Sequence, residues 1–138
     1  MLNVNDYRFV VRNLSYEEIE HVEGNKFLLE PIYKSEIGKI DETHYYIEVE
    51  VKIGNAKDKP VPFIIDAKVR VEYRFSNFTD IKKDKTTIVE FLQSKGLLTL
   101  FPYLRSVVTG ISTTAMISPV YLPLIDIRNI SNKTIICI

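Results

Sequence analysis

The feature that most constrains the fold is a nearly uncharged stretch at residues 97–124, in which Arg105 is the single charged side chain. Apolar residues recur in it at spacings of three and four: Leu97, Leu100, Phe101, Leu104, Val107, Val108, Ile111 and Ala115. This period predicts an amphipathic helix with a wide apolar stripe. We expect Thr99 to cap this helix, Pro102 to lie in its first turn and Pro119 to mark its end.

The residues before this helix show the alternation that is typical of β-strands with one face in water. It is cleanest at residues 47–53 and 63–75, where every second residue is apolar. Weaker patterns predict strands at residues 7–16 and 27–40, the latter with a bulge or loop near Pro31 or Gly38.

A short helix is predicted between the strands and the long helix. Thr87 and Glu90 have the spacing of a capping box, and Gly96 is placed to close the helix that they open. Residues 76–86 are then a charged loop, and the apolar tail after Ile125 is expected to be extended. The order of elements predicts an α+β fold, a four-stranded antiparallel sheet followed by a short and a long helix, in a single domain at residues 1–138.

The charge balance and the lone cysteine limit the classes of function. Lys plus Arg equals Asp plus Glu, so the chain lacks the basic field that general binding to nucleic acid needs. Cys137 has no partner for an internal disulfide, and no signal peptide is visible at residues 1–6, so we expect a cytoplasmic setting. Residues 97–124 are long enough to cross a membrane, but Arg105 and three prolines favour a buried or interface helix.

No pattern in the chain predicts catalysis. His21 and His44 have no neighbours at the spacing of metal ligands, and there is no phosphate-binding glycine loop or nucleophile elbow. We therefore expect no enzyme, metal or cofactor. A small-ligand binder or enzyme with a pocket between sheet and helix is an alternative, which requires a polar cluster inside that pocket.

The outer face of the long helix is weakly polar, with Ser and Thr between its apolar residues. Such a helix is usually covered on that face too, by a partner chain or a ligand. Zero net charge makes self-association easier, and binding of apolar peptide segments is compatible with it.

Two motifs in the helical region resemble those of the SecB family of export chaperones. Leu100-Phe101-Pro102-Tyr103-Leu104-Arg105 is similar to the start of that family's main helix, and Ile117-Ser118-Pro119-Val120-Tyr121 to the segment that follows it. Phe63-Ile64-Ile65-Asp66 matches the family's apolar-then-acidic strand pattern. The resemblance covers residues 7 to 124, whereas the tail at residues 126–138 departs from the second helix and acidic tail of the family.

The resemblance implies an ATP-independent holdase that binds unfolded or non-native polypeptides in apolar grooves, assembled as a tetramer that is a dimer of dimers. It implies protein export with a SecA motor, or alternatively a dedicated chaperone of an antitoxin or other single client. A non-chaperone interaction protein on the same fold is a further alternative. The expected client-contact residues are Phe63, Ile65, Tyr73, Phe75, Phe91, Leu92, Leu97, Leu98, Phe101 and Leu104, each of which has plain core packing as its alternative role.

The resemblance also assigns two further sets of residues. The oligomer interface is expected at Tyr103, Val107 and Ile111. Glu18 and Asp66 are the acids available for docking a motor, although the outward residues of strand 63–75 lean basic, unlike the acidic face of export members.

Overall fold

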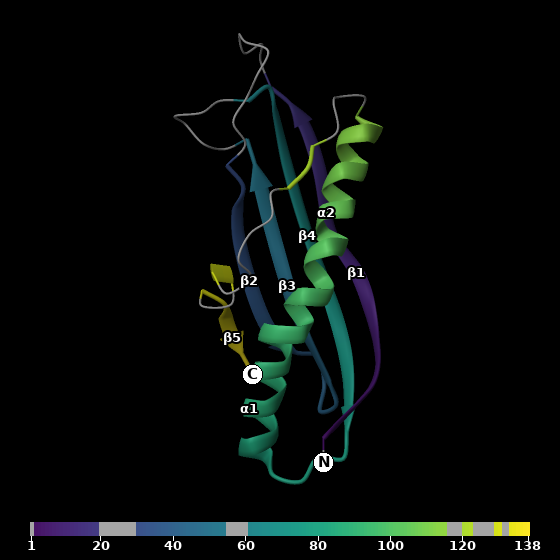
Figure 1. Ribbon diagram of the computed structural model, residues 1–138, viewed down its shortest axis with the longest axis vertical. Coiled ribbons are helices and arrows are strands. Elements are labelled where there is room, and N and C mark those ends of the chain that lie inside the picture. Colours follow the sequence, from purple (N-terminus) through teal and green to yellow (C-terminus); the bar gives the residue numbers. More distant parts are fainter. Residues whose placement is uncertain (1, 20–29, 55–60, 116–119, 123–128, 131–132) are drawn as a thin grey trace.

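The computed structural model describes residues 2–19, 30–54, 61–115, 120–122, 129–130 and 133–138. In these residues the chain forms one sheet with a layer of helix across one face (Figure 1). The strands are β1 (Asn3–Glu18), β2 (Ile32–Lys39), β3 (His44–Ile53), β4 (Phe63–Ser76) and β5 (Ile135–Cys137). The helices are α1 (Ile81–Phe91), a π-helical segment η1 (Leu92–Gly96) and α2 (Leu97–Thr114).

The sheet has five strands in the order β1-β4-β3-β2-β5. The first four are antiparallel to their neighbours, as the sequence predicts, whereas β5 runs parallel to β2. The α+β class is therefore confirmed, and the prediction of a purely antiparallel four-stranded sheet is corrected. Residues 135–137 are extended, as expected of the tail, and they add the fifth strand, whereas residues 129–130 are helical, so the expectation of an extended tail is wrong there.

The two long central strands alternate as their sequences predict. All the apolar residues at odd positions of β4, from Phe63 to Phe75, are buried on the helix side, and Ile47, Val49, Val51 and Ile53 of β3 join them. Intervening residues carry charges to the other face. This alternation places the core between the sheet and the helices.

The weaker strands differ from their predictions in extent. β1 is longer than residues 7–16, and two irregularities in its register, at Val4/Asp6 and Val11/Asn13, keep its apolar residues facing the helix. β2 pairs with β3 without a break, so no bulge or loop lies at Gly38; Pro31, the alternative place for one, precedes the strand and is irregular. Gly38 is needed there because any Cβ would collide with the ring of Tyr46. Residues 27–29 lie outside the described residues.

The first helix begins earlier than predicted. Asp80 caps it, because its carboxylate accepts hydrogen bonds from the backbone N–H groups of Lys82 and Lys83 at 3.0 and 3.4 Å. Asp84 reaches back to the N–H groups of Thr79 and Asp80. Thr87 lies inside the helix and donates to the carbonyl of Lys83 at 2.9 Å. The predicted capping box at Thr87 is therefore wrong, and the loop before the helix is shorter than residues 76–86.

The short and long helices form one continuous helical run along the sheet (Figure 1). Gly96 has helical angles and does not end a helix; a Cβ there would lie 3.1 Å from Ile47 of β3, so glycine lets the run approach the sheet closely. Thr99 donates to the carbonyl of Lys95 and caps nothing, and Pro102 lies inside α2. Local patterns fail here because apolar burial on the sheet holds the helical run together.

The apolar stripe of the long helix is confirmed. Its buried residues are Leu97, Leu100, Phe101, Leu104 and Val108, while Val107 and Ile111 are half-buried at its side. Leu98 on the outer side is 60% exposed. Among the described residues, no helix is both long and apolar enough to cross a membrane.

Candidate functional site

A strip of apolar side chains lies exposed on the helix-side face of β1. Register with β4 places these residues beside the core positions of that strand, because directly paired residues share a face. Tyr7, opposite Tyr73, is 59% exposed. We call this set the β1 strip; its members are Val4, Tyr7, Phe9, Val11, Leu14 and Tyr16. A run of exposed apolar residues of this kind marks an interaction surface.

One flank of α2 continues the β1 strip. The ring of Phe9 lies 4.7 Å, centroid to centroid, from that of Tyr103. Val107 and Ile111 follow Tyr103 at helical spacing and are half-buried against the core. The three residues predicted for an oligomer interface thus lie on one flank of α2. Their role in assembly stays a prediction.

The other flank of α2 faces β2 and later parts of the chain. Arg105 donates to the carbonyl of Leu122 at 3.2 Å, and Thr109 donates to that of Val120 at 2.8 Å. These bonds tie residues 120–122 to α2, and Val120 and Leu122 are buried in the core. The core is therefore closed on this side partly by irregular chain.

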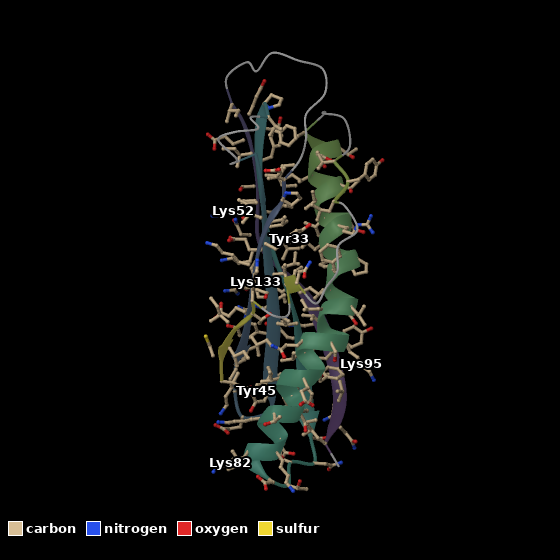
Figure 2. All side chains as sticks on the ribbon, turned by 60° about the vertical axis from the view of Figure 1, so that its left-hand side comes forward. Tyr33, Tyr45, Lys52, Lys82, Lys95 and Lys133 are labelled. Atoms are coloured by element: carbon tan, nitrogen blue, oxygen red, sulfur yellow. The ribbon has the colours of Figure 1, made fainter. Side chains whose placement is uncertain are left out.

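A hollow of about 360 Å³ opens between β2 and the residues Asn129, Ile130 and Lys133. Tyr33 and Lys133 both line it and are labelled in Figure 2. The hydroxyl of Tyr33 is buried and has no hydrogen-bond partner among the described residues. Burial raises the pKa of Tyr33 to about 12, against the opposing effect of Arg105. An unpaired buried hydroxyl is a rare and unfavourable feature, so a group that completes its bonding is expected at this hollow.

β5 covers part of the edge of β2 beside this hollow. It pairs with Glu36, Ile37 and Gly38 only. A hydrogen bond joins the hydroxyls of Ser35 and Thr134 at 2.6 Å. Ile135 and Ile136 remain 62% and 49% exposed. This part of the sheet is thus held by few apolar contacts.

A second hollow, of about 480 Å³, lies at the start of α1 against the turn between β2 and β3. Tyr45, Phe78, Ile81 and Ile88 give it an apolar lining, and Lys39, Glu42, Asp84 and Lys85 supply charges at it. Ile81 is the most exposed large apolar residue of the described chain. The mixed lining offers apolar contact with few fixed polar groups, which suits a side chain more than a specific small ligand.

The sheet face away from the helix carries a network of ion pairs. Arg70 bonds Glu48 at 3.0 Å and lies over the ring of Tyr46, and Arg8 bonds Glu72 at 2.7 Å. Lys68 and Glu50 pair more loosely, at 3.8 Å. Lys52 projects from this face in Figure 2. The charges therefore neutralise one another across strands, which leaves no strong field of one sign.

The two acids expected to dock a motor lie on opposite faces of the sheet, because Glu18 is opposite the helix-side Phe63 and Asp66 belongs to the charged far face. Glu18 is exposed at the end of β1. Asp66 is half-buried on β4, with Lys52 at 4.0 Å from one carboxylate oxygen; the other oxygen has no hydrogen-bond partner among the described residues. Both lie at the same end of the β1–β4 pair, where Glu18 is opposite Phe63. Their role in docking stays a prediction.

Most of the residues predicted to contact clients are buried beneath the helices. Phe91 is half-buried and Leu98 is exposed; the others have almost no exposed surface: Phe63, Ile65, Tyr73, Phe75, Leu92, Leu97, Phe101 and Leu104. These eight belong to the hydrophobic core of the chain. A client reaches them only if the helical run lifts from the sheet, so client contact by them stays a prediction.

His44 has partners that the sequence analysis missed. Its Nδ1 donates to Asp41 at 2.6 Å and its Nε2 accepts from the Nε–H of Arg74 at 2.8 Å, because an arginine can only donate. The pKa of Asp41 is lowered to about 2, chiefly by the backbone N–H of Thr43. The signal in the sequence was the spacing of three residues between Asp41 and His44, which a turn brings together. The cluster orders the β2–β3 turn, and His21 lies outside the described residues.

Comparison with known proteins bears on the fold. No protein-family model matches the chain, and no curated protein sequence matches it. Among solved structures, it is similar to the Mycobacterium tuberculosis SecB-like chaperone Rv1957, solved in complex with a ChAD peptide from the Rv1956 HigA1 antitoxin; the TM-score is 0.66, the identity 13%, and the match covers 91% of each chain.

A second similar structure is a protein of unknown function from Streptococcus agalactiae. Its TM-score is 0.43 at 14% identity, over 90% of this chain and 99% of that one. The likeness to Rv1957 extends over nearly all of both chains, so the five-stranded sheet and its helical layer form a SecB-like fold.

Proposed function

We propose that this protein is an ATP-independent holdase chaperone, which binds non-native polypeptide segments on its helix-side face. The observation that carries the proposal is the apolar surface left on both flanks of α2: the β1 strip on one side, and the hollow beside β2 on the other. The SecB-like fold supports it.

The physical basis is nonspecific apolar burial. Each Å² of apolar surface removed from water contributes about 25 cal/mol, whatever the sequence that covers it. A surface that offers area with few fixed polar groups therefore binds many apolar segments and discriminates weakly among them. Folded proteins hide such segments, so the chaperone releases a client when the client folds.

We assign the two flanks of α2 to different polypeptides. The β1 strip lies on an edge strand, whose outer edge pairs with no strand among the described residues. A second copy of this chain covers it, with Tyr103, Val107 and Ile111 in the interface, and pairs of such dimers form a tetramer. Client segments then use the β2 side.

The remaining features of the proposal follow the resemblance. The protein works in the cytoplasm without a cofactor, and it has no catalytic role. In export, a SecA-type motor receives the client, with Glu18 and Asp66 as docking acids. The ion pair between Asp66 and Lys52 is loose at 4.0 Å, which leaves the carboxylate free to exchange Lys52 for a cation of the motor.

A dedicated chaperone of one client is the second candidate. Rv1957 was solved with an antitoxin peptide, and its fold is shared over 91% of this chain. A protein of this kind binds one segment tightly and ignores generic unfolded chains. An antitoxin segment is the first such client to test.

The test is a titration of dye-labelled, reduced and carboxymethylated α-lactalbumin with the purified protein, followed by fluorescence anisotropy. The same protein in its native form is the folded control. Saturable binding of the unfolded form alone supports the holdase. Binding of neither form at micromolar protein excludes a general holdase and leaves the dedicated chaperone, for which an antitoxin peptide library is the next probe.

A further inference from the structure

We propose that residues 134–138 occupy the client site of this protein, and that a bound polypeptide segment displaces them from the edge of β2. The inference rests on the proposed holdase function and names its site. The β2 edge is the main-chain edge of Ile32–Lys39 that faces away from β3 (Figure 1).

The first observation is that the β2 edge is longer than the strand that covers it. β5 pairs with Glu36, Ile37 and Gly38, in parallel. The edge at residues 32–35 pairs with no strand in the described part of the chain, and Ile32 is half exposed. An open edge beside apolar surface is a template for another extended chain.

The second observation is that β5 is weakly held. It is three residues long, and its two isoleucines keep about half or more of their surface in water. Its firmest side-chain tie lies just before it, where Thr134 bonds Ser35. Local segments with few buried apolar contacts open at low cost in free energy.

The third observation is Tyr33, which lines the adjoining hollow and whose buried hydroxyl has no hydrogen-bond partner among the described residues. Tyr33 packs against Phe101 of α2, with ring centroids 5.9 Å apart, so its side chain is fixed in place. A client segment laid along residues 32–35 directs alternate side chains to the helix side, where a polar one can supply the acceptor that the phenol hydroxyl lacks. Residues 134–138, which occupy the edge in this structure, leave the hydrogen bond of the Tyr33 hydroxyl unmade.

The occupant is therefore an extended, β-branched segment that runs parallel to β2. Residues 135–137, Ile-Ile-Cys, show what the edge accepts: Ile136 is beside Ile37 on the helix side, and Ile135 is beside Glu36 on the far side. A segment of a non-native protein with this pattern pairs with more of the edge than β5 does, and so it replaces β5.

The proposal predicts how strongly β5 weakens client binding. The apparent affinity of a site falls in proportion to the fraction of molecules in which the site is open. If β5 leaves the edge in about a tenth of the molecules, its removal tightens the apparent Kd about tenfold.

The test fixes β5 in place by a reversible bond. The hydroxyl oxygens of Ser35 and Thr134 are 2.6 Å apart, close to the separation of two bonded sulfurs. A variant with Ser35→Cys, Thr134→Cys and Cys137→Ser is oxidised, its disulfide is verified by mass, and its binding of carboxymethylated α-lactalbumin is measured before and after reduction. We expect at least a tenfold loss on oxidation and recovery on reduction.

A second variant tests the opposite direction. A chain that ends at Lys133 lacks β5, and we expect it to bind the same client about tenfold more tightly than the intact chain. Circular dichroism verifies that it is folded. The Cys137→Ser chain, with its own measured affinity, is the reference for the disulfide variant, and the unmodified chain is the reference for the shortened one.

The outcomes separate the inference from the holdase function. Equal binding by the oxidised, reduced and shortened proteins overturns the inference and leaves the holdase standing. Weaker binding by the folded shortened chain also overturns it, since β5 then contributes to the site. Absence of client binding in every form overturns both.

Discussion

At the scale of single residues, Tyr33 is the side chain whose environment departs most from a satisfied core. Its hydroxyl is buried, under the influence of Arg105, and lacks a hydrogen-bond partner in the part of the chain that the structure describes. A buried hydroxyl without a partner costs about 1–3 kcal/mol in desolvation. The protein keeps a polar group where phenylalanine would pack equally well.

Tyr33→Phe is expected to raise the free energy of unfolding by about 1 kcal/mol at neutral pH, because it removes the orphan hydroxyl. If a client supplies the missing acceptor, the same variant binds carboxymethylated α-lactalbumin more weakly. Urea unfolding and the anisotropy titration measure the two effects. A variant that is less stable, or one that binds the client as well as the unmodified chain does, contradicts this account of Tyr33.

Alkaline pH gives an independent check on Tyr33. Its folded-state pKa of about 12 exceeds the value of about 10 in an unfolded chain. The contribution that this pKa difference makes to the free energy of unfolding is fully present below about pH 10. It is lost as the pH rises to about 12, since the unfolded chain loses its proton first. Across this pH range the free energy of unfolding should therefore fall more for the unmodified protein than for Tyr33→Phe. Equal falls in the two proteins, measured by urea unfolding at each pH, would refute this account of Tyr33.

At this scale the sequence identified apolar residues well and their accessibility poorly. Eight of the ten predicted client-contact residues, such as Phe63 and Leu104, are core positions. Alternation shows which face a residue takes but not whether a helix covers that face. The pattern of β1 carried the missing information, since an edge strand has fewer neighbours to cover its apolar residues.

At the scale of elements, the helical run shows how tertiary contact overrides local signals. Asp80 and Asp84 form a reciprocal cap that the sequence analysis passed over for Thr87 and Glu90. Both pairs have plausible spacing, and only the packing of Ile88 and Leu92 on the sheet decides which one starts the helix. Gly96 and Pro102 disfavour a helix interior by about 1 and 3 kcal/mol, yet they lie within a run that the core holds on one side.

Asp80→Ala is expected to lower the free energy of unfolding by about 1 kcal/mol, because two N–H groups of the first turn lose their acceptor. Thr87→Ala is the matched control: it removes a hydroxyl from inside the same helix and should change stability by less than about 0.5 kcal/mol. Urea unfolding followed by circular dichroism measures both. A larger effect at Thr87 than at Asp80 would place the cap where the sequence alone suggested.

The tail is the element that the sequence predicted least completely. Its β-branched residues indicated extended chain, and β5 is extended. Its pairing with β2 was out of reach because the partner strand lies about a hundred residues earlier, and three residues carry no register signal. The direction of β5, parallel to β2, depends on the point at which the helices between β4 and β5 bring the chain back to the sheet.

At the scale of the whole molecule, the two sheet faces differ in what they offer a partner. The far face is a network of neutralised charges, which gives little apolar area and no strong field. The helix-side face has apolar surface along both flanks of α2. Interactions with other polypeptides are therefore expected on the helix side.

Val11→Lys in the β1 strip is expected to shift the assembly toward smaller species, since a charge buried between two copies costs more than one left in water. Asn13→Lys is the matched control on the same strand, because Asn13 pairs with Lys68 on the opposite face. Sedimentation velocity gives the masses. Equal masses for Val11→Lys and the unmodified oligomer, or a monomeric unmodified protein, would refute the interface.

Hydrogen exchange of the protein with and without carboxymethylated α-lactalbumin tests the central claim most directly, since it reports both binding and its place. We predict slower exchange at residues 32–35, whose edge gains a partner strand, and faster exchange at residues 135–137, which are displaced. Protection confined to the far face, or unchanged exchange throughout at saturating client, would contradict a polypeptide site on the β2 edge.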